Sequence, residues 1–134
     1  MRSATTALLF CLSAAPPAFV AAQPAASVPA AVRQIEVQDI RSLMVEAIDS
    51  PSGQARAQLV GTLPDAVTQH FRASSPILLA VTTERRYRQP GCSRLKLSFA
   101  QEGVHLPGLA QPERRGVEVG MNYCRDGRPP QSLE

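Results

Sequence analysis

The stretch that decides the fold is Cys92-Ser93-Arg94-Leu95-Lys96-Leu97-Ser98-Phe99, in which apolar and polar side chains alternate. Such alternation is typical of a β-strand with one face on a core. Two further segments repeat the pattern, one at 77–83 and the other at 117–123. Three period-two segments in succession predict an antiparallel meander.

The loop at 89–91 predicts the register of the first two segments. A three-residue loop makes the numbers of facing residues add up to 180, which places Val81 opposite Phe99 and Arg86 opposite Arg94. A two-residue loop would shift the register by one and turn apolar side chains out of the core. We therefore expect the three-residue loop.

The two cysteines outside the leader predict the register of the second pair of strands. Matching Cys92 with Cys124 places Leu97 opposite Val119, so one register gives both an apolar face and a cross-strand disulfide. In an oxidising compartment two such cysteines are expected to be bonded rather than free thiols. The bond would contribute about 3.7 kcal/mol in the chain-entropy model.

Helical spacing precedes the strands. The segment 40–48 has apolar residues at i, i+3, i+4, i+7 and i+8, with Asp39 placed to cap it, although a hairpin of 40–48 with 54–60 fits the same turn. A second helix is expected with Thr62 as its cap and Pro64 in its first turn. Leu63, Val67 and Phe71 share one face of that second helix.

These elements predict a small α+β domain: a three- to four-stranded antiparallel sheet with one or two helices on one face and one disulfide. A short strand is expected within 34–38. The predicted organisation is a signal peptide at 1–22, an Ala/Pro-rich tether at 23–33, a single α+β domain at 34–124 and a flexible C-terminal tail at 125–134.

The first segment has the anatomy of a secretory signal peptide. A positive start at Arg2 is followed by a nine-residue apolar stretch at 7–15, which is about half the length needed to span a bilayer and so argues against a retained anchor. Small residues at 20–22 predict cleavage after Ala22. The mature protein is then periplasmic or secreted, and its net charge falls from +3 to +2 because Arg2 is lost.

Residues for catalysis or metal binding are sparse. The only histidines, His70 and His105, lie in different segments without a zinc-type spacing. Ser74, His105 and Asp126 include the residue types of a Ser–His–Asp triad, but nothing in the sequence fixes their geometry. We therefore expect a protein without cofactor or metal and without enzymatic activity, with a small cell-envelope enzyme or inhibitor as the alternative.

A cationic group of four residues, Arg86, Arg88, Arg94 and Lys96, is the candidate face for an anionic partner. Like charges facing each other on a sheet disfavour folding, so a crowded strip favours an anionic ligand. The competing interpretation is a solvated face neutralised by carboxylates, namely Glu84, Glu118 and Asp126. Nucleic acid is not expected, because the net charge is low and few aromatic side chains are available for stacking.

Two stretches carry a resemblance to a known group of proteins. Tyr87-Arg88-Gln89-Pro90-Gly91-Cys92-Ser93-Arg94-Leu95-Lys96 and Val117-Glu118-Val119-Gly120-Met121-Asn122-Tyr123-Cys124-Arg125-Asp126-Gly127-Arg128-Pro129-Pro130 resemble small exported proteins encoded in bacterial conjugative-element and plasmid-transfer gene clusters. The resemblance implies a cell-envelope protein that acts beside a transfer apparatus. It carries over no catalytic residues. We therefore expect a non-enzymatic binding or assembly protein with a partner in the envelope.

Overall fold

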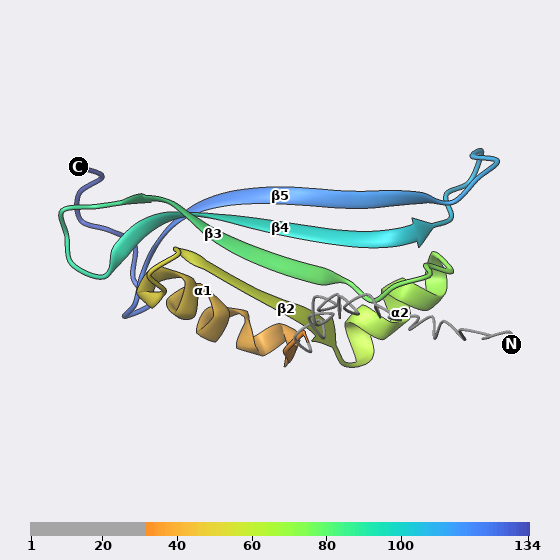
Figure 1. Ribbon diagram of the computed structural model, residues 1–134, viewed down its shortest axis with the longest axis horizontal. Coiled ribbons are helices and arrows are strands. Elements are labelled where there is room, and N and C mark those ends of the chain that lie inside the picture. Colours follow the sequence, from red (N-terminus) through yellow and green to blue (C-terminus); the bar gives the residue numbers. More distant parts are fainter. Residues whose placement is uncertain (1–31) are drawn as a thin grey trace, which may run out of the picture.

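A five-stranded sheet carries two α-helices on one side in the computed structural model, which describes residues 32–134 (Figure 1). The elements follow in the order β1 (Gln34–Glu36), a short 3-10 helix (Val37–Asp39), α1 (Ile40–Asp49), β2 (Gln54–Val60), α2 (Thr62–His70), β3 (Leu78–Arg86), β4 (Cys92–Val104) and β5 (Glu113–Cys124). The strands lie side by side in chain order, with β1 parallel to β2 and the other neighbours antiparallel. The expected signal peptide and the tether up to residue 31 lie outside the described residues.

The α+β class and the helix at 40–48 are confirmed, but the sheet is larger than predicted and is mixed rather than antiparallel. The extra strand is β2, where the inward positions Ala55 and Ala57 have small side chains that give a weak apolar signal. Ala57 lies opposite Leu79 of β3. β1 pairs in parallel with the far side of β2, and α1 supplies the crossover that a parallel pair needs.

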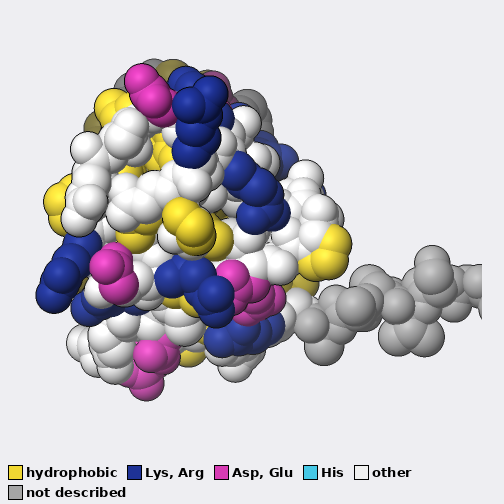
Figure 2. Space-filling model, turned by 90° about the vertical axis from the view of Figure 1, so that its left-hand side faces the viewer, with side chains coloured by type: hydrophobic (Ala, Val, Ile, Leu, Met, Phe, Trp, Pro, Cys, Tyr) yellow, Lys and Arg dark blue, Asp and Glu magenta, His cyan; other side chains and the backbone are white. Residues whose placement is uncertain are grey.

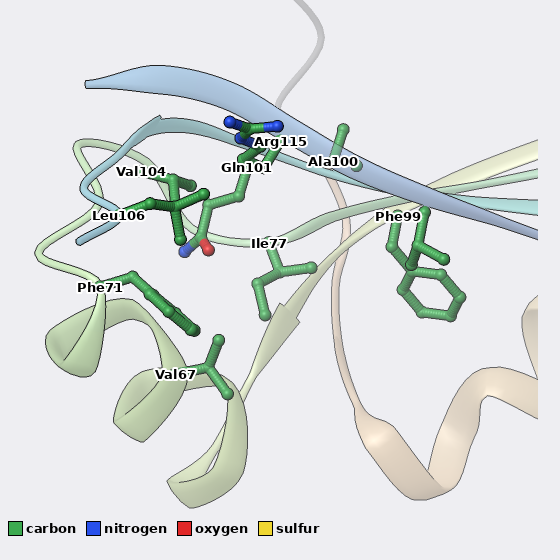
Figure 3. Close-up of a pocket in the computed structure, with 11 residues that line it drawn as sticks. Val67, Phe71, Ile77, Phe99, Ala100, Gln101, Val104, Leu106 and Arg115 are labelled. Atoms are coloured by element: carbon green, nitrogen blue, oxygen red, sulfur yellow. The ribbon is translucent and has the colours of Figure 1, made fainter. Parts of the chain in front are cut away.

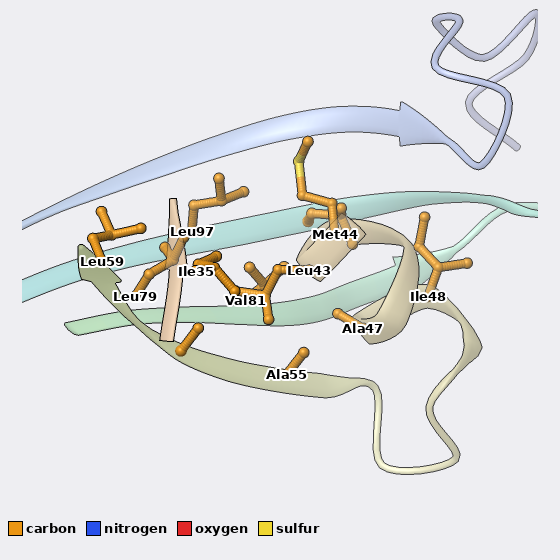
Figure 4. Packing of buried hydrophobic residues seen from close by; sticks show 12 residues of the cluster. Ile35, Leu43, Met44, Ala47, Ile48, Ala55, Leu59, Leu79, Val81 and Leu97 are labelled. Carbon is orange, nitrogen blue, oxygen red and sulfur yellow. The ribbon is translucent and has the colours of Figure 1, made fainter. Parts of the chain in front are cut away.

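The core lies between α1 and the inner side of the sheet (Figure 4). Four α1 side chains enter it: Leu43, Met44, Ala47 and Ile48. Their spacing of one, three and four residues forms the apolar stripe that a helix buries against a sheet. Asp39 takes the predicted position before α1 without a side-chain capping bond; instead the Ser42 hydroxyl donates to the Asp39 backbone oxygen at 2.6 Å.

The second helix covers less of the sheet than the sequence predicts. Leu63 is 65% exposed, Val67 and Phe71 are only partly buried, and Pro64 is the one fully buried residue of α2. Thr62 is the first residue of this helix, after Gly61 at the N-cap, and makes no side-chain capping bond. α2 therefore lies on the inner side of the sheet without close packing along its length, and leaves part of β4 and β5 uncovered.

The predicted register between β3 and β4 is wrong. Val81 lies opposite Leu97 instead of Phe99, and an irregularity at residue 84 shifts the pairing so that Arg85 lies opposite Arg94. The Tyr87 N–H donates to the backbone oxygen of Cys92, 3.0 Å away, which closes a four-residue loop at 88–91 instead of a three-residue one. One additional loop residue and one bulge residue account for the two-residue difference.

The predicted register between β4 and β5 is confirmed. Leu97 lies opposite Val119 and Phe99 opposite Val117. Cys92 and Cys124 face each other with 4.0 Å between their α-carbons and form the predicted disulfide. No helix within residues 32–134 is long and apolar enough to cross a bilayer.

The segment 125–134 leaves the sheet after Cys124, as expected, and then contacts the β3–β4 loop. The Arg88 N–H donates to the Glu134 backbone oxygen at 2.7 Å, and the Gln131 N–H donates to the Gln89 side chain at 2.8 Å. The C-terminus therefore lies near the closed end of the β3–β4 hairpin (Figure 1).

Candidate functional site

Arg86 lies apart from the other cationic residues. Its guanidinium donates to the backbone oxygens of Ile48, at 2.5 Å, and Ser50, at 3.0 Å. These groups lie at the C-terminal end of α1, so Arg86 satisfies the Ile48 carbonyl, which the helix leaves without a partner, and places a cation at the negative end of the helix dipole. The expected pairing of Arg86 with Arg94 does not occur.

Arg94 and Lys96 lie on the outer side of the sheet, where each has an acidic neighbour. The Arg94 Nε is 3.8 Å from a Glu84 carboxylate oxygen, and the Lys96 Nζ is 3.7 Å from Glu118. Arg94 also donates to the Asn122 side-chain oxygen at 3.2 Å. Both cations are thus close to opposite charge, as the interpretation of a neutralised, solvated face requires.

Arg88 lies in the β3–β4 loop with an 87% exposed side chain, 3.9 Å from the Glu134 carboxylate. Figure 2 shows one end of the molecule, where basic and acidic side chains are interspersed rather than gathered by sign. The four cationic residues are therefore divided among a helix end, a loop and the outer side of the sheet. Only Arg94 and Lys96 share a surface.

A groove opens between α2 and the inner side of β4 and β5 (Figure 3), with a volume of about 250 Å³. Val67 and Phe71 rise from α2 toward it, and Val104 and Leu106 face them from the other side (Figure 3). Its lining is mostly apolar: Val67, Phe71, Ile77, Phe99, Ala100, Gln101, Val104, Leu106, Arg115, Gly116 and Val117. The groove is thus an apolar binding surface that the fold leaves open.

Gln101 links the two sides of this groove by hydrogen bonds. It is 7% exposed, and its amide nitrogen donates to the Thr68 hydroxyl at 2.8 Å and to the Ser75 backbone oxygen at 3.0 Å. Gln101 lies on the same, inner face of β4 as Leu97 and Phe99. The sequence signal available for this contact was a polar residue that continues an apolar alternation.

The apolar surface continues from the groove along β5. Val117, opposite Phe99, is 58% exposed, and Val119 is 42% exposed. Both stand on the inner side of the sheet, where the sequence predicts burial under a helix. They are exposed because α2 does not pack closely over this part of the sheet.

The two histidines, His70 and His105, are far apart in the sequence but lie near each other in the fold. His70 and His105 both line a second hollow of about 340 Å³. The His105 N–H donates to the Phe71 backbone oxygen at 2.9 Å, and the His70 ring meets the Phe71 ring edge-on at 4.7 Å. Among residues 32–134, no group of three or more His, Cys, Asp or Glu side chains is arranged to hold a metal ion.

The Ser–His–Asp set drawn from the sequence is not assembled. Asp126 follows Cys124, which pairs with the first residue of β4, whereas His105 follows the last residue of that strand, Val104. At the usual rise per strand residue these ends are about 40 Å apart.

No protein-family model, curated protein or solved structure matches the chain.

Proposed function

We propose that the protein is an exported, non-enzymatic binding or assembly protein that holds an apolar segment of a protein partner in the groove between α2 and β4–β5. The observation that carries this proposal is the groove's lining, in which Val67, Phe71 and Phe99 remain accessible within the described fold. An accessible apolar surface of this kind is typical of interaction sites. The disulfide supports the export, because cytosolic thiols are kept reduced.

The proposed setting is the cell envelope beside a conjugative transfer apparatus. Its support is the resemblance of 87–96 and 117–130 to proteins encoded in transfer gene clusters. Deleting the gene should lower mating frequency in a donor that carries the element, and the intact gene should restore it. Unchanged mating would remove this setting while leaving the groove proposal open to its own test.

Site-specific photocrosslinking in the intact envelope tests the groove. A benzoylphenylalanine at Phe71 stands inside the groove, whereas one at Leu63 stands on the same helix outside it. We expect one defined crosslinked partner from position 71 and none from position 63. Equal products from both positions, or none from either, would contradict the proposal.

The alternative is a small envelope enzyme or inhibitor, and the observation in its favour is the hollow that His70 and His105 share. A hydrolase panel with the purified mature chain tests the enzyme. Turnover that disappears in His105→Ala, with thermal stability unchanged, would favour catalysis over the binding role.

A further inference from the structure

β5 is the last strand of the described sheet and has no neighbour on its outer edge. Its first eight residues, 113–120, are all exposed. The helices pack mainly under β2, β3 and β4 (Figure 1), and α1 also reaches the end of β5, where Arg41 donates to the Tyr123 hydroxyl at 3.2 Å. A long strand with a free edge is a template for pairing with another chain.

The backbone groups available at this edge follow from the pairing with β4. The Arg125 N–H donates to the Gly91 backbone oxygen at 2.9 Å. Hydrogen-bonded and non-bonded pairs alternate in an antiparallel ladder, and the register is unbroken from residue 115 to residue 124. Odd-numbered residues of β5 therefore bond to β4, and the even-numbered residues turn their N–H and C=O groups to the free edge.

We infer that a second copy of this chain pairs with β5 along this edge, antiparallel and about a two-fold axis at Val119. Val119 then faces its own equivalent, and Val117 faces Met121 of the second copy. The central pairs on the inner side are apolar, Arg115 faces Tyr123 beyond them, and no like charges stand opposite each other. This inference is independent of what the groove holds.

The neighbouring registers are less favourable. An axis at Glu118 sets two carboxylates opposite each other, which is destabilising. An axis at Gly120 puts two residues without side chains at the centre, where no cross-strand contact forms. An axis at Val117 places Arg115 against Val119 and shortens the overlap, whereas the axis at Val119 pairs residues 114–124 throughout.

The dimer also extends the groove. The second copy's Met121 lies opposite Val117, which lines the groove of the first copy. The second copy's Tyr123 lies opposite Arg115, at the sheet side of the same groove. Each groove then gains apolar surface from the other chain, and the side chains of Val117 and Val119 gain apolar neighbours across the new strand pair.

Sedimentation of the mature chain with its disulfide intact tests the dimer. We expect twice the protomer mass at micromolar concentrations, and a monomer for Val119→Lys with an unchanged circular-dichroism spectrum. Val37→Lys is the matched control, because Val37 is 38% exposed but lies outside the sheet, and it should remain dimeric. A monomeric wild type, including one that instead binds an added extended peptide at β5, overturns the inference, as does a dimer that survives Val119→Lys.

Disulfide trapping tests the register. Val119→Cys should form a covalent dimer under mild oxidation, because its sulfur faces its equivalent across a non-bonded pair. Val117→Cys should give no covalent homodimer, while mixing it with Met121→Cys should give a heterodimer. Peptide mapping must show Cys92 still joined to Cys124. Efficient trapping of Val117→Cys with itself overturns the axis at Val119.

Discussion

Arg86 donates from its guanidinium to the backbone oxygen of Ile48, 2.5 Å away, and so joins the end of β3 to the end of α1. This contact gives the residue a structural role at a helix terminus. It also removes one of four cations from the face predicted to bind an anionic partner.

Replacing Arg86 should lower stability. We expect Arg86→Ala to reduce the free energy of unfolding by about 1 to 2 kcal/mol, because the last carbonyls of α1 lose a charged donor. Urea denaturation followed by circular dichroism measures it. Arg88→Ala is the control: its side chain is largely exposed in the same hairpin, and its effect should stay within about 0.5 kcal/mol. Equal effects for the two variants would contradict the capping role.

The disulfide should contribute more than any single side-chain contact described above. We expect the double variant Cys92→Ser, Cys124→Ser to lose about 3 to 4 kcal/mol, since the cross-link restricts the unfolded chain. Chemical denaturation with and without reductant gives the value. Ellman titration of unreduced native protein should detect no free thiol from this pair, and two reactive thiols per chain would refute the bond.

Gln101 should hold α2 in its position relative to β4, and so keep the shape of the groove. In Gln101→Leu the Thr68 hydroxyl and the Ser75 carbonyl lose their donor, at a cost of about 1 to 2 kcal/mol. We also expect faster amide hydrogen exchange in 62–70 than in α1. Ser98→Ala, on the outer side of the same strand, is the control and should leave exchange in α2 unchanged; no difference between the variants would deny Gln101 its positioning role.

A charge inside the groove should prevent partner capture. Val67→Asp places a carboxylate among apolar side chains, and its desolvation would weaken binding by about tenfold or more. Photocrosslinking yield from position 71 in the intact envelope is the readout. The thermal midpoint should change little, because Val67 is only partly buried, and retained capture would place the site elsewhere.

Charge reversal on the outer side of the sheet should have little effect on partner capture. Arg94→Glu with Lys96→Glu should leave capture from the groove within about twofold, because exposed ion pairs contribute little energy. The same crosslinking assay measures the yield. Loss of capture in this variant alone would move the binding surface to the outer side and restore the anionic-partner prediction for these two residues.

The sequence was sufficient for the β4–β5 pair because two independent cues agreed there. The cysteines required one register, and Leu97 opposite Val119 filled the inner side in that same register. At the β3–β4 hairpin no second cue existed, and the irregularity at residue 84 left no trace in the alternation. A bulge changes the pairing without changing the apolar pattern before it.

The groove was not predictable for a different reason. The periodicity of α2 correctly placed Val67 and Phe71 on one face, but periodicity does not give the distance of a helix from a sheet. That distance depends on a side-chain contact between Gln101 and Thr68, which are far apart in sequence. Which apolar residues remain exposed is therefore a tertiary property.

The order of the strands across the sheet equals their order along the chain. Each strand therefore pairs with one that was synthesised just before it. If the chain is exported as proposed, with its amino end leading, each strand arrives after the strand with which it pairs. The disulfide joins the first residue of β4 to the last residue of β5, so it can form only after all five strands have been delivered.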